Sequence, residues 1–128
     1  MSGKKRILVI DDDPDFSAAI RKILTSADYA VTQAGSMKEG MKSVEEVRPD
    51  LILLDVMMEN YDDGFNMCYG LKHDDRYRHI PVIIVTAVTE ATGLKFDPKT
   101  DGEYLEAEGY FQKPINPKIL LEKVAGLL

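Results

Sequence analysis

The chain has 128 residues, a length typical of one domain and sufficient to bury a hydrophobic core. Its formal net charge of −6 argues against a generic nucleic-acid binder, which needs a basic patch. The single cysteine, Cys68, excludes an internal disulfide, and the N-terminal apolar run over residues 7–10 is too short for a signal peptide or a membrane span. We therefore expect a cytoplasmic protein with no nucleic-acid and no membrane partner.

Strand and helix signals alternate through the first half of the chain. Residues 7–10 are apolar and rich in β-branched side chains, as in a buried strand, and Asp13 followed by Pro14 is typical of a helix start. A second strand is predicted over residues 29–34, and the capping box of Ser36 and Glu39 begins a second helix. The predicted core-facing positions of these helices are Phe16, Ala19, Ile20, Ile23, Leu24 and Ala27, then Met37, Met41, Val44 and Val47.

The second half continues the alternation. Residues 51–54 are four consecutive apolar residues that run into Asp55, as expected for a strand buried on both faces. A loop over 56–64 and a third helix follow, and residues 81–85 form a fourth strand ending at Thr86. Residues 88–108 are the least regular, with at most a helical turn at 103–107, before a short fifth strand at 110–112. The third helix is predicted to bury Phe65, Met67, Cys68 and Leu71. The last helix is predicted to start at Asn116-Pro117 and to bury Leu120, Leu121, Val124 and Leu127.

Five strands alternating with helices predict an α/β fold with a doubly wound parallel sheet, because crossovers between parallel strands are right-handed. The common flavodoxin-like strand order for five strands is 2-1-3-4-5. We expect one domain over residues 1–128, with its core at about 5–127 and no output domain.

Polar residues stand where four of the predicted strands end. In that strand order Asp11, Asp12 and Asp55 converge on one crevice, with Thr86 and Lys113 beside it. Three neighbouring carboxylates repel one another unless a cation binds, and oxygen ligands with room for several waters favour Mg²⁺. With Mg²⁺ and Lys113 to neutralise phosphate oxygens, the set is suited to phosphoryl transfer onto an aspartate.

The stretches that carry these residues resemble the response-regulator receiver domain, from about Lys5 to the C-terminus. Each stretch is weak evidence alone, but their order and their placement at four strand ends make a specific pattern. They are Ile7-Leu8-Val9-Ile10-Asp11-Asp12-Asp13-Pro14, Leu53-Leu54-Asp55-Val56-Met57-Met58, Val85-Thr86-Ala87 and Tyr110-Phe111-Gln112-Lys113-Pro114.

The resemblance implies that Asp55 accepts a phosphoryl group from a histidine kinase or a histidine phosphotransfer protein. It implies that Asp12, Asp55 and the backbone carbonyl of Met57 ligate Mg²⁺, with Asp11 acting mainly through water. Thr86 would move inward to bond the acyl phosphate and Lys113 would pair with it, which would switch contacts with a downstream protein target. We expect that such a protein is not an enzyme in the ordinary sense. Because neither the Met57 nor the Val88 side chain can orient an attacking water through a hydrogen bond, we also expect the phosphoryl group to be lost slowly.

Three alternatives remain open at this point. A flavodoxin-type FMN binder would need a phosphate-binding loop where residues 11–13 are acidic, and a hydrolase would need a second acid beside Asp55, where residues 56–58 offer none. The third is a receiver-like adaptor that works without phosphorylation. It is favoured by Glu59 in the loop after the acceptor and by the 26 residues that separate Thr86 from Lys113.

Overall fold

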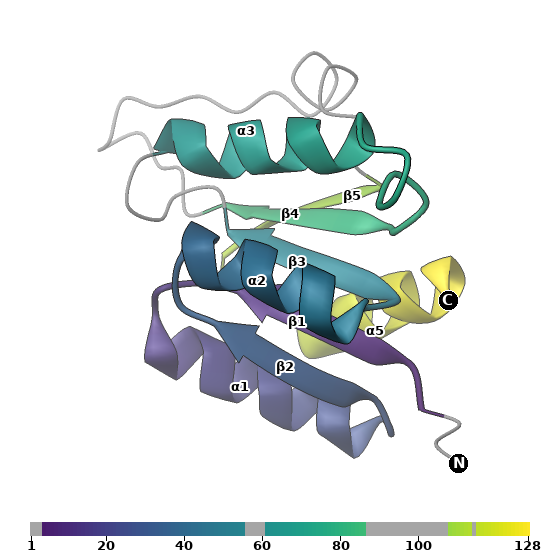
Figure 1. The fold of residues 1–128 in the computed structure, drawn as a ribbon. Coiled ribbons are helices and arrows are strands. Elements are labelled where there is room, and N and C mark those ends of the chain that lie inside the picture. The colour runs from purple at the N-terminus through teal and green to yellow at the C-terminus, as the bar shows by residue number, and fades with distance from the viewer. Residues whose placement is uncertain (1–3, 56–60, 87–107, 114) are drawn as a thin grey trace.

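A computed structural model describes residues 4–55, 61–86, 108–113 and 115–128. Strands and helices alternate from β1 to β4, as the sequence predicts, and β5 and a last helix follow residues 87–107, which lie outside the described ranges (Figure 1). In chain order they are β1 (Arg6–Ile10), α1 (Pro14–Ser26), β2 (Ala30–Ala34), α2 (Met37–Val47), β3 (Leu51–Asp55), α3 (Tyr61–Lys72), β4 (Val82–Thr86), β5 (Gly109–Gln112) and α5 (Pro117–Leu127).

The five strands form one parallel sheet in the order β2-β1-β3-β4-β5, so the predicted α/β architecture and strand order are confirmed. Helices cover both faces of the sheet, and a separate hydrophobic cluster lies on each face. One cluster includes residues of α2 and α3, and the other includes residues of α1 and α5. β3 is buried along its whole length because both of its faces are covered.

Local sequence signals account for the starts of α1, α2 and α5. The Asp13 side chain accepts hydrogen bonds from the backbone N–H groups of Asp15 and Phe16, and Asn116 caps α5 in the same manner. Ser36 accepts a hydrogen bond from the Glu39 backbone N–H, as its capping role requires. The predicted starts of these three helices are therefore confirmed.

Two expectations about the helices are wrong. α3 begins at Tyr61, whereas a loop was expected through residue 64; Asp62 and Asp63 fall in its first turn, where negative charge favours a helix. In α1, Ala19 and Ala27 are exposed, and the buried positions are Ser17, Ile20 and Leu24. The buried face of α1 is thus rotated away from Ala19, with Phe16 and Ile23 partly buried at its margin.

Several predictions concern residues outside the described ranges: Met57, Glu59, Val88 and the helical turn at 103–107. Within the described ranges, no helix combines the length and the apolar character needed to cross a membrane.

Candidate metal and phosphoacceptor site

The strand register places the expected site residues at one edge of the sheet. Ile10, the last residue of β1, pairs with Leu54 of β3. Asp11, which follows β1, and Asp55, which ends β3, therefore lie at the same level of neighbouring strands. Asp55 in turn pairs with Val85, and Thr86 pairs with Gln112, the residue before Lys113. Parallel strands therefore bring residues from four distant parts of the chain to one edge.

Asp11 is held firmly at this edge. Its backbone N–H donates to the carbonyl of Ala34, 3.0 Å away, and its Oδ1 accepts from the backbone N–H of Asp13 at 2.8 Å. Only 4% of the residue is exposed. The same turn thus starts α1 and orients the Asp11 carboxylate, because Asp13 is also the helix cap.

Lys113 joins the two buried carboxylates. Its Nζ lies 2.9 Å from Asp11 Oδ2 and donates a hydrogen bond to Asp55 Oδ2 at 3.3 Å. Asp55 is 3% exposed, so the attraction acts in a poorly hydrated environment. The three side chains therefore lie together at one edge of the sheet, and their roles in a site remain a prediction.

The environment favours the charged form of Lys113. Burial by itself lowers the pKa of the ammonium, but the contact with Asp11 and the charge of Asp55 together outweigh burial. The pKa of Lys113 is therefore held above its ordinary value. The side chain stays positively charged at neutral pH and above.

Asp12 completes a cluster of three acids. One carboxylate oxygen each from Asp11, Asp12 and Asp55 lies within 4.8 Å of the others, a spacing at which one metal ion can be bound. Among the residues that the structure describes, Lys113 is the cation in contact with this cluster, so three carboxylates share one ammonium and a further cation would reduce their repulsion. Hard oxygen donors with this excess charge fit a divalent ion such as Mg²⁺.

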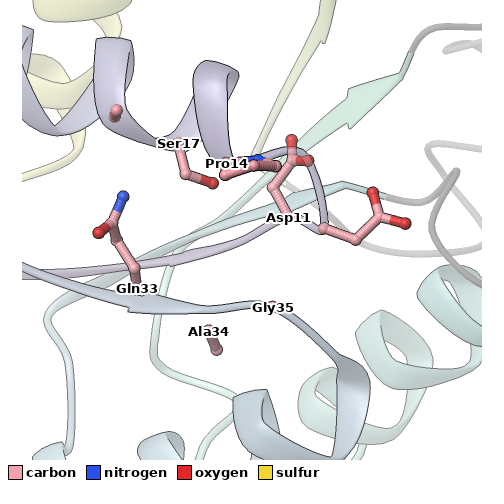
Figure 2. Close-up of a pocket in the computed structure, with 8 residues that line it drawn as sticks. Asp11, Pro14, Ser17, Gln33, Ala34 and Gly35 are labelled. Carbon is pink, nitrogen blue, oxygen red and sulfur yellow. The ribbon is translucent and has the colours of Figure 1, made fainter.

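An open pocket of about 250 Å³ borders the cluster on the α1 side. Asp11 and Asp12 form part of its wall, and Figure 2 shows the Gln33 amide reaching from β2 toward α1. Ser17 lines the pocket from α1, and its buried hydroxyl has no hydrogen-bond partner among the described residues. Mg²⁺ usually keeps several water ligands when it binds to a protein. The pocket has room for such waters, and the Ser17 hydroxyl is a polar group to which one of them could hydrogen-bond.

The structure describes the other predicted site residues only in part. Thr86 ends β4 beside β5, as predicted, but its side chain is not described. Met57 lies outside the described residues. Ser17 was missed because a serine on the apolar face of a helix is usually only a tolerated polar residue; its spacing from Ile20 and Leu24 was the available signal.

A doubly wound parallel sheet with carboxylates and a lysine at the carboxyl edge of its strands defines an α/β domain with an acidic cluster that could hold a cation. The sequence model of the response regulator receiver domain matches residues 7–125, nearly the whole chain. The chain belongs to this family. Receiver domains of response regulators serve two-component signalling, so the predicted family is confirmed.

Individual relatives agree with this assignment. The chain is 37% identical over 123 residues to the DNA-binding dual master transcriptional regulator RpaA of Synechocystis, a match that covers 96% of this chain and 48% of that protein. Among solved structures, the receiver domain of a DNA-binding response regulator (merR) from Colwellia psychrerythraea has a TM-score of 0.85 and 28% identity, covering 97% of this chain and 98% of the other. A CheY-like receiver domain protein from Methanospirillum hungatei has a TM-score of 0.83 and 26% identity, covering 97% and 93%.

The chain spans about half the length of the curated relatives it matches. The relatives named above include proteins described as DNA-binding, so they do not support the expectation that nucleic acid is no partner. The acidic net charge applies only to these 128 residues.

Proposed function

We propose that the chain is a phosphoacceptor switch in which Asp55 takes a phosphoryl group from a phosphohistidine of a histidine kinase or a histidine phosphotransfer protein. The convergence of Asp55, Lys113 and the two neighbouring acids is the observation that carries this proposal. Family membership favours it over an FMN binder or a phosphate-ester hydrolase.

In the transfer step, an oxygen of the Asp55 carboxylate forms a bond to phosphorus while the phosphorus–nitrogen bond of phosphohistidine breaks. The electron pair of that bond stays with the imidazole nitrogen, and Asp55 becomes an acyl phosphate. Lys113, already 3.3 Å from Asp55 Oδ2, pairs with a phosphoryl oxygen and offsets its charge. Asp12, Asp55, the Met57 carbonyl and, through water, Asp11 would hold Mg²⁺, which supplies further neutralisation of phosphoryl oxygens.

The switch rests on Thr86. It ends the strand next to β5, and its β5 partner Gln112 immediately precedes Lys113. A hydroxyl that turns toward the acyl phosphate gains a hydrogen bond available only after transfer, so phosphorylation shifts the population toward that arrangement. A downstream protein then binds one arrangement better than the other.

The test is the intact mass of the protein after incubation with acetyl phosphate and Mg²⁺, which needs no knowledge of the kinase. The wild type should gain one phosphoryl group, and Asp55→Asn should gain none. Asp50→Asn is the matched control, because Asp50 immediately precedes β3 at the opposite end from Asp55, where its Oδ2 accepts from the backbone N–H of Arg6. A wild type that stays unmodified would instead support the adaptor that works without phosphorylation.

A further inference from the structure

The ammonium of Lys113 has a third neighbour besides the two carboxylates. Its Nζ lies 4.1 Å from the centroid of the Phe16 ring, over the ring face. The face of an aromatic ring carries negative charge density and attracts a cation at this distance. The ammonium therefore lies among two carboxylates and one ring face.

Phe16 is itself fixed in place by two independent contacts. Its backbone N–H donates to Asp13 Oδ1 at 3.2 Å, which ties it to the start of α1. Its ring is partly buried against the hydrophobic cluster that includes residues of α1 and α5. The ring is thus packed against the core on one side, and the Lys113 ammonium lies over its face.

We propose that Phe16 is a positioning residue that directs the Lys113 ammonium toward the oxygens of Asp55. The proposal rests on the proposed function, since it assigns how the lysine is aimed in that reaction. A ring face attracts the ammonium without accepting a strong hydrogen bond, so it holds the lysine near Asp55 and leaves its donors free to turn to a phosphoryl oxygen. An aliphatic side chain at residue 16 fills the space but lacks that attraction.

The test compares Phe16→Leu, which removes the aromatic ring, with Phe16→Tyr, which keeps it. With acetyl phosphate and Mg²⁺ as the only reactants, kinase docking does not enter the measurement. Phe16→Leu should lower the phosphorylation rate constant roughly threefold to tenfold, while Phe16→Tyr should stay within about twofold of the wild type. Ile23→Ala is the packing control, because Ile23 contacts the same cluster from α1 and should leave the rate near that of the wild type.

Proton NMR of the unphosphorylated protein gives a second readout. The ε-methylene protons of Lys113 should be shifted upfield by the ring in the wild type and in Phe16→Tyr, and should return to ordinary values in Phe16→Leu. Ordinary shifts in the wild type, or equal rate losses in the Leu and Tyr variants, would overturn the proposal. If no variant accepts a phosphoryl group, the proposed function fails, and the shifts alone decide whether Phe16 positions Lys113.

Discussion

At the scale of single residues, charge balance dominates the site. Asp11 and Asp55 are buried and share Lys113, whereas Asp12 is exposed and belongs to the same oxygen cluster. Like charges this close destabilise the metal-free protein, and a bound cation removes the repulsion. Neutralising Asp12 should therefore stabilise the metal-free protein and weaken the binding of the metal.

We predict that Asp12→Asn unfolds at a higher temperature than the wild type in EDTA but gains little from Mg²⁺. Saturating Mg²⁺ at about 100 times its dissociation constant should stabilise the wild type by about 2.7 kcal/mol, because only the folded state binds it. Thermal unfolding followed by circular dichroism with EDTA and with Mg²⁺ measures both effects. Asp15→Asn, an exposed acid in the first turn of α1, is the control, and equal Mg²⁺ stabilisation of Asp12→Asn and wild type would contradict the assignment.

At the scale of elements, α2 approaches the sheet closely at Gly40. A Cβ added there would lie 2.7 Å from Ile10 Cδ1 and 3.1 Å from its Cγ1. Ile10 is fully buried in the cluster of α2 and α3, so its side chain has little room to move. The glycine is required by packing, although glycine disfavours a helix interior.

We predict that Gly40→Ala lowers the free energy of unfolding by about 1–2 kcal/mol, because the steric cost exceeds the gain of about 1 kcal/mol in helix propensity. Gly70→Ala in α3 is the matched control, since a Cβ there meets nothing within 4 Å. It should be neutral or slightly stabilising. Urea unfolding of both variants gives the comparison, and a stabilised Gly40→Ala would show that α2 can move away from β1.

At the scale of the whole molecule, a partly buried ion pair joins elements at the sheet edge opposite the acidic site. Lys72, at the end of α3, donates to Glu108 Oε1 at 2.6 Å and to the carbonyl of Ile80 at 3.1 Å. Glu108 Oε2 also accepts from the backbone N–H of Val82 at 2.6 Å, at the start of β4. The pair thereby ties α3, β4 and the chain entering β5 together.

We predict that Lys72→Met alone destabilises the protein by roughly 2–3 kcal/mol, because it leaves the Glu108 carboxylate partly buried without its cation. The double variant Lys72→Met with Glu108→Gln should lose less than the sum of the two single variants. Urea unfolding of the four proteins gives the coupling energy. Strictly additive losses would mean that the two side chains contribute independently.

Several features of this protein follow from the sequence alone. The helix caps at Asp13, Ser36 and Asn116, and the apolar strand that ends in Asp55, depend on residues next to one another, so local chemistry predicts them. The alternation of strands and helices then restricts the topology to a parallel doubly wound sheet. The acidic cluster follows in turn, because parallel strands end at a common edge.

Tertiary structure alone decided how these side chains meet. Lys113 reaches Asp55 across 58 positions of sequence, and its contact with the Phe16 ring depends on how α1 and the end of β5 pack. The burial of Ser17 and the pairing of Lys72 with Glu108 depend likewise on helix rotation and on contacts between distant segments. A sequence pattern specifies which face of an element is apolar, but the rotation and distance between packed elements arise only when all side chains fill the core together.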